Sequence, residues 1–139
     1  MTCTISYSKD NNAQLTDLLS QGLADYAKKT KGLSPIETFS FSLKDEEQTL
    51  VGGCNGVMYY GCLYVDMLWI DEKCQRLGYG TQLMPAAEKL GKEKGCLFAT
   101  VNTMDWEALE FYKKLGYQIE FERHGYLKNS IFYFLRKEL

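Results

Sequence analysis

Two periodicities alternate along the chain, and together they predict a mixed α/β protein. Apolar residues recur at spacings of three and four, the helical period, in three segments: residues 12–29, 79–94 and 106–115. Short apolar or alternating runs typical of strands occur in seven segments: residues 2–7, 36–43, 49–60, 62–70, 97–101, 117–122 and 130–136. Asn11 or Asn12 can cap the first helix, and residues 44–47 form a hairpin turn. We expect one domain over residues 1–139, because no linker or repeat divides them.

The strand at 62–70 is unusual because it is apolar on both faces, which predicts a central strand covered on both sides. Asp66 is its only charged residue. A buried carboxylate is costly unless it is paired or functional, and burial would raise its pKa toward that of a general base. Asp66 is therefore a candidate base, with a structural carboxylate paired to a tyrosine or arginine as the open alternative. Glu37, on an earlier strand, is a second candidate.

A glycine-containing loop follows this strand and leads into the next helix. Gly78 and Gly80 allow a tight turn whose backbone amides converge at the helix N-terminus, which predicts an anion site, most naturally a phosphate. The loop is not a nucleotide-hydrolysing P-loop, because no lysine follows the second glycine. It also departs from the dinucleotide-binding fingerprint, because Leu83 occupies the third small-residue position.

Composition narrows the class of protein further. A net charge of −2 does not favour nucleic acid, and no apolar run approaches the length of a membrane span. The N-terminus has no signal-peptide pattern, and the five cysteines, odd in number and without a C-x-x-C pair, predict reduced thiols in a cytoplasmic protein. A single histidine, His124, argues against both a Cys–His nucleophile and a metal site, so we expect no metal.

Two segments in the same order and spacing carry a family resemblance. Gln75, Gly78 and Gly80 fit the pattern [QR]-x-x-G-x-[GA], and residues 108–117 resemble the pattern A-x-x-F-Y-x-K-x-G-[FY]. The chain thus resembles the GNAT superfamily of acetyl-coenzyme A-dependent N-acetyltransferases, most closely a small bacterial type, from about Thr49 to Glu122. The resemblance implies a central mixed, mostly antiparallel sheet of about six to seven strands, flanked by helices and splayed near Ile70.

The resemblance also implies an activity. A GNAT enzyme moves an acetyl group from acetyl-coenzyme A to a primary amine of a small molecule or peptide, by direct attack in a ternary complex. The alternative is an acyl-coenzyme A binding or sensing module with little or no catalysis. Acidic residues in the middle of the chain weakly favour a cationic acceptor. Many relatives dimerise, and the aromatic-rich strand at 130–135 could serve a homodimer, although we expect it to be buried against the protein's own helices.

The family's functional residues map onto matching positions. Tyr112 would lie near the coenzyme sulfur, where a phenol can protonate the departing thiolate. A bulge would free the strand backbone around Leu68 to pair with the pantetheine arm and to polarise the thioester carbonyl. The expected coenzyme-binding residues are Leu68, Trp69, Ile70, Gln75, Arg76, Leu77, Gly78, Tyr79, Gly80, Thr81, Asn102, Thr103 and Phe111. On the alternative interpretation, Trp69 and Tyr112 simply pack in the core.

Two positions depart from the family pattern. Asp105 stands where the family often has an asparagine that contacts the coenzyme, and its charge would repel phosphate, so we expect Asn102 or Thr103 to substitute. Pro85 lies inside the helix that follows the loop. It removes the hydrogen bond to the Thr81 carbonyl and should kink the helix, but it leaves the first-turn amides free to hold phosphate.

Overall fold

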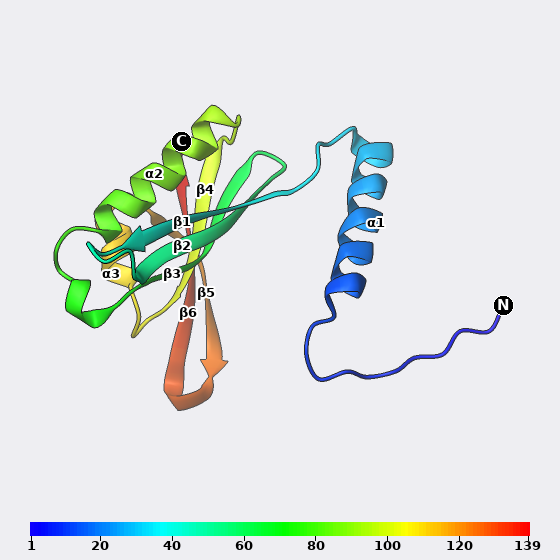
Figure 1. Ribbon diagram of the computed structural model, residues 1–139, viewed down its shortest axis with the longest axis horizontal. Helices are drawn as coiled ribbons and strands as arrows, with labels where there is room; N and C mark the ends of the chain where they lie inside the picture. Colours follow the sequence, from blue (N-terminus) through cyan, green and yellow to red (C-terminus); the bar gives the residue numbers. More distant parts are fainter. The chain divides into compact units, whose positions relative to one another are not determined.

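The computed structural model describes all 139 residues as two compact units, residues 1–35 and 36–139 (Figure 1). The first unit contains helix α1 (Ala13–Lys31). The side-chain oxygen of Asn12 accepts a hydrogen bond from the Leu15 amide at 2.9 Å and caps the helix, as predicted. Gly32 ends it in the left-handed conformation, with φ of 67°.

The strand predicted at residues 2–7 is wrong. These residues form no strand, and the only residues of the first unit in regular secondary structure are those of α1. Alternation marks residues that fit a pleated surface, but a strand exists only where another strand satisfies its backbone hydrogen bonds.

The second unit is built on a six-stranded sheet in the order β1-β2-β3-β4-β6-β5. Its strands are β1 (Glu37–Lys44), β2 (Leu50–Tyr59), β3 (Cys62–Ile70), β4 (Phe98–Met104), β5 (Gln118–Tyr126) and β6 (Ser130–Glu138). Its helices are α2 (Gly80–Glu93) and α3 (Leu109–Lys114), with short 3₁₀ turns η1 (Glu72–Cys74) and η2 (Leu127–Asn129). Only β3 and β4 pair in parallel. The mixed, mostly antiparallel sheet with flanking helices is the predicted fold.

Helix α2 lies across the sheet and contacts β2 and β3 (Figure 1). Leu63 approaches the helix so closely that a Cβ on Gly91 would lie 3.1 Å from its Cδ2 atom. Met84 and Ala87 are fully buried on the same helix. The buried Glu88 is satisfied by the Tyr117 hydroxyl at 2.8 Å and by the Lys137 ammonium at 2.9 Å. The Glu88 carboxylate therefore connects α2 to Tyr117 and to Lys137 of β6, and its buried charge is paired.

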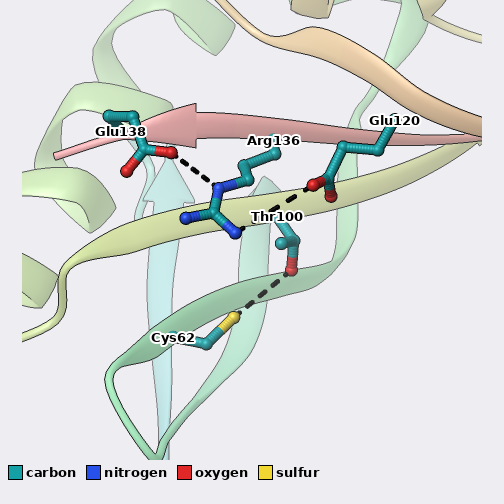
Figure 2. A network of polar contacts seen from close by, with 5 residues as sticks. All are labelled: Cys62, Thr100, Glu120, Arg136 and Glu138. Carbon is teal, nitrogen blue, oxygen red and sulfur yellow. Dashed lines mark hydrogen bonds and ion pairs between the residues drawn. The ribbon is translucent and has the colours of Figure 1, made fainter.

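Polar contacts link neighbouring strands among β3, β4, β5 and β6 (Figure 2). The Cys62 thiol lies 3.5 Å from the Thr100 hydroxyl, across the β3–β4 junction. Arg136 bonds Glu138 at 2.7 Å, pairs with Glu120 at 4.0 Å and stacks on the Phe98 ring. Such exposed ion pairs contribute little stability each, but they mark the closed part of the sheet. None of the helices is both long and apolar enough to cross a membrane.

Candidate active site

Strand β3 carries a β-bulge at Asp66. In the pairing with β2, Gly56 lies opposite Val65 and Asn55 lies opposite Met67, so Asp66 has no partner. One extra residue on one strand bends that strand and reverses the alternation of its side chains. The bulge implied by the family resemblance therefore exists, two residues before Leu68.

The reversal of side chains overturns two expectations about this strand. Before the bulge, Leu63 and Val65 are buried; after it, Leu68 packs against the core while Met67 and Trp69 are 63% and 64% exposed. The second half of β3 is therefore not covered on both faces, and Trp69 is not a core residue. The Asp66 side chain is exposed as well, which contradicts the predicted buried carboxylate.

Beyond the bulge, β3 separates from β4. Their parallel pairing ends at Tyr64 and Thr100, which gives the splay expected near the end of the strand. The Asp71 amide bonds the Val51 carbonyl of β2 at 2.8 Å. Because alternate residues of a strand direct their backbone groups to opposite edges, those of Leu68 and Ile70 point to the open edge. One of these open backbone groups, the Ile70 carbonyl, accepts a hydrogen bond from the side-chain N–H of Gln75 at 2.8 Å.

The glycine loop makes a tight turn and leads directly into α2, as the sequence predicts. Gly78 adopts φ of 85°, and the Thr81 hydroxyl donates to its carbonyl at 2.7 Å. The first helix amides that find acceptors are those of Gln82 and Leu83, both on the Tyr79 carbonyl. The amides of Gly80 and Thr81 are thus open at the positive end of the helix dipole, the arrangement that binds phosphate.

Gly80 also connects the loop to the second family segment. A Cβ at this position would lie 2.9 Å from Cζ of Phe111, closer than real side chains approach. The Phe111 ring therefore occupies the space that a side chain at position 80 would need. The glycine at position 80 therefore allows close packing of the Phe111 ring, whereas the glycine at position 78 provides a positive φ.

A cavity of about 750 Å³ lies between the splayed strands, the loop and α3, within the size range of small-molecule sites. It brings together these residues predicted from the sequence: Asp66, Leu68, Trp69, Ile70, Gln75, Arg76, Gly78, Tyr79, Gly80, Thr81, Asn102, Thr103, Phe111 and Tyr112. Leu77 does not line it and is 63% exposed. Sequence reasoning missed Val65, Met67, Cys74, Glu107 and Ala108. Met67 could have been found only by recognising that the strand alternation reverses.

Tyr112 is buried in the cavity wall. Its ring meets the rings of Phe111 and Tyr117 edge-on, at centroid distances of 5.2 and 5.9 Å. Its hydroxyl forms no hydrogen bond within the protein. Burial, reinforced by the nearby Cys54 and Glu107, raises the pKa of Tyr112 to about 12. The phenol therefore keeps its proton at neutral pH and is a hydrogen-bond donor to whatever enters the cavity.

Polar residues in β4 line the cavity, whereas Asp105, which directly follows β4, does not. Asn102 donates to the Tyr64 hydroxyl at 3.0 Å, and the buried Thr103 hydroxyl accepts from the Ala108 amide at 3.1 Å. Asp105 does not line the cavity and instead bonds the Ile131 amide. The expected repulsion between Asp105 and phosphate therefore has no geometric basis.

Other candidates lie elsewhere. Glu37 pairs with Lys94 at 3.7 Å and does not line the cavity, so it is poorly placed to act as a base. Pro85 lies on the exposed side of α2, which continues unbroken through it.

All five cysteines are free thiols, and burial raises the pKa of Cys54 and Cys96. His124 is exposed beside Glu122, and no group of three or more potential ligands assembles a metal site.

Comparisons with known proteins agree with this geometry. Residues 9–117 match the model of the acetyltransferase (GNAT) family. The chain is 32% identical over 106 residues to blasticidin-S acetyltransferase from Streptomyces morookaense, covering 76% of this chain and 78% of that one. An acetyltransferase from Bacillus cereus ATCC 14579 superposes with a TM-score of 0.78 at 31% identity, over 96% of this chain and 98% of the other.

A third comparison concerns the fold. A protein from Bacillus anthracis str. Ames, named a putative streptothricin acetyltransferase, was solved in complex with acetyl-coenzyme A. It shares the fold with a TM-score of 0.66 at 17% identity, over 73% of this chain and 62% of that one. The family model, which spans most of the chain, and the relative from Streptomyces morookaense show that the protein belongs to the GNAT family of acetyltransferases and is an acetyl-coenzyme A-dependent acyltransferase.

Proposed function

We propose that the protein transfers the acetyl group of acetyl-coenzyme A to a primary amine of a small molecule, by direct attack in a ternary complex. The observation that carries the proposal is the single cavity in which the open amides of Gly80 and Thr81, the open edge of β3 and the Tyr112 hydroxyl meet. Each feature matches one part of acetyl-coenzyme A: the open amides match the pyrophosphate, the open edge of β3 matches the amide-bearing pantetheine arm, and the Tyr112 hydroxyl matches the sulfur.

The loop and β3 would hold the donor. The Gly80 and Thr81 amides bind the pyrophosphate, and Arg76, which also lines the cavity, adds a positive charge. The arm runs along the open edge of β3 as an additional strand would, pairing with the backbone of Leu68. A backbone N–H at this edge would polarise the thioester carbonyl as negative charge develops on its oxygen.

Tyr112 and Asp66 would handle the protons. The amine nitrogen attacks the thioester carbon, the carbon–sulfur bond breaks, and the departing thiolate takes the phenolic proton of Tyr112. Asp66 accepts the proton that the amine loses, directly or through a water molecule. Because Asp66 is exposed at the bulge, solvent reaches it and a water relay is sterically free.

A small-molecule acceptor is favoured over a peptide by the relative that acts on blasticidin S. That relative is similar over about three quarters of both chains, which includes the loop and the cavity strands. Blasticidin S is accordingly the first compound to test, followed by aminoglycosides, polyamines and lysine peptides.

The test is an amine panel with release of free thiol as the readout, combined with calorimetric binding of acetyl-coenzyme A. We expect turnover of at least one small amine. Gly80→Val, which places a branched side chain against Phe111 and the phosphate site, should weaken acetyl-coenzyme A binding at least about tenfold. Gly22→Ala is the control, since a Cβ there meets nothing within 4 Å. Binding without turnover of any amine would instead support the acyl-coenzyme A sensing module.

A further inference from the structure

A second hollow lies next to the coenzyme cavity and shares part of its wall. It has a volume of about 340 Å³ and is lined by β1, β2 and β3. Met67 and Trp69 line both cavities, so the two spaces meet along the part of β3 that follows the bulge. Asp66, the candidate base, precedes Met67 directly. A molecule seated in the hollow can therefore extend a group to the reacting centre.

The floor of the hollow is formed by Gly52 and Gly53, where steric contacts leave no room for a side chain. A Cβ on Gly53 would overlap the Phe41 carbonyl oxygen, and the positive φ of 149° also favours glycine there. A Cβ on Gly52 would lie 2.6 Å from the Trp69 carbonyl oxygen. Neither residue can carry a side chain without moving the backbone, so the hollow is a fixed feature of β2.

The walls of the hollow combine exposed apolar groups with unpaired donors. Trp69, Met67 and Leu50 are all more than 60% exposed, a concentration of large apolar surface that usually marks a binding site. The Trp69 indole N–H, the Asn55 amide N–H₂ and the Ser42 hydroxyl have no hydrogen-bond partner within the protein. Asn55 is held in orientation by the Ser40 hydroxyl, which donates to its Oδ1 atom at 2.7 Å.

A third hollow, beside Tyr64 and Asn102, does not offer the same chemistry. Asn102 already donates to Tyr64, and Glu120 is paired with Arg136. Thr100 likewise contacts Cys62 (Figure 2). These polar groups of the third hollow already have partners within the protein, whereas the Trp69 N–H, the Asn55 N–H₂ and the Ser42 hydroxyl have none.

We propose that the hollow over Gly53 holds the body of the acceptor, and that this body is a planar ring with hydrogen-bond acceptors along its edge. The ring lies against the Trp69 indole and the Met67 thioether, its edge accepts hydrogen bonds from Asn55 and Ser42, and its amine reaches Asp66. This inference rests on the proposed function and names the class of substrate: ring-bearing amines over open-chain amines.

The experiment compares three amines with the enzyme as it exists: 1-(2-aminoethyl)cytosine, 2-phenylethylamine and 1,4-diaminobutane. Dissociation constants are measured by calorimetry on protein saturated with coenzyme A, and KM is measured where turnover occurs. We expect the cytosine amine to bind best. Trp69→Ala should weaken binding of both ring amines about tenfold more than it weakens binding of diaminobutane. Asn55→Leu should affect the cytosine amine alone.

The controls separate this inference from a general loss of structure and from the proposed function. Trp69→Phe should restore most of the ring preference, and Trp106→Ala should change nothing, since Trp106 is exposed outside both cavities. Ser42→Phe, which fills the hollow from β1, should abolish the preference without altering acetyl-coenzyme A affinity. Equal effects of Trp69→Ala on all three amines, or no ring preference in the wild type, would overturn the inference. Ring preference without acetyl transfer would overturn only the proposed function.

Discussion

At the scale of the residue, Tyr112 combines burial, a free hydroxyl and a raised pKa in the wall of the cavity. Tyr112→Phe keeps the ring that packs against Phe111 and Tyr117 and removes the hydroxyl group that carries the proton. If the phenol protonates the leaving thiolate, kcat should fall about 10²- to 10⁴-fold, while acetyl-coenzyme A affinity stays within a few-fold. Steady-state kinetics and calorimetry measure the two quantities separately.

Tyr60→Phe is the matched control for this substitution, because Tyr60 is a half-exposed tyrosine outside the cavity. Its kcat should equal that of the wild type. A Tyr112→Phe enzyme within threefold of wild-type kcat would mean that Tyr112 packs in the core without taking part in the reaction.

At the scale of the element, α2 combines the N-terminus that we propose binds phosphate with a proline in its sixth position. Pro85 is exposed and its missing N–H leaves the Thr81 carbonyl without its helical partner. Pro85→Ala should restore that bond and stabilise the fold by about 1–3 kcal/mol, after allowing for the greater entropy of the unfolded chain. Thermal denaturation should show an increase of a few degrees in Tm.

The same variant tests whether the phosphate site depends on the proline. The Gly80 and Thr81 amides lie one turn earlier, so acetyl-coenzyme A affinity should not change. A loss of affinity on Pro85→Ala would show that a distortion of α2 positions these amides. An unchanged or lower Tm would show that the helix has already adjusted to the proline.

At the scale of the whole molecule, buried tyrosines make stability depend on alkaline pH. An unfolded tyrosine loses its proton near pH 10, whereas burial raises the pKa of Tyr112 to about 12 and that of Tyr117 further, with Glu88 accepting its hydrogen bond. The unfolded state therefore releases protons first as pH rises. The unfolding free energy should begin to fall above about pH 8, because Cys54 and Cys96 ionise first in the unfolded chain, and Tyr112 alone should lower it by about 2–3 kcal/mol between pH 10 and 12.

Urea denaturation at pH 8, 10 and 11.5 measures this decrease. Tyr112→Phe should remove part of the pH dependence, whereas Tyr60→Phe should leave it unchanged. If the unfolding free energy of the wild type were the same at pH 8 and 11.5, the two buried phenols would have to ionise as readily in the folded protein as in the unfolded chain.

Much of the fold follows from local sequence because each signal acts within a few residues. The Asn12 cap, the left-handed glycines at positions 32 and 78, and the helical spacing in α2 depend on neighbours along the chain. The helix predicted at 106–115 is shorter, since α3 begins only at Leu109. Residues 2–7 were mispredicted for the complementary reason that alternation alone supplies no pairing partner.

The sequence by itself determined the order of elements, the glycine loop and the residues that gather around it, because these depend on backbone freedom and on two spaced motifs. Only the tertiary structure decided what the second half of β3 does. The bulge at Asp66 arises from the register between β2 and β3, which no local pattern encodes. That one extra residue brings Asp66, Met67 and Trp69 to the surface, and it places Met67 and Trp69 in the walls of both the candidate active-site cavity and the hollow over Gly53.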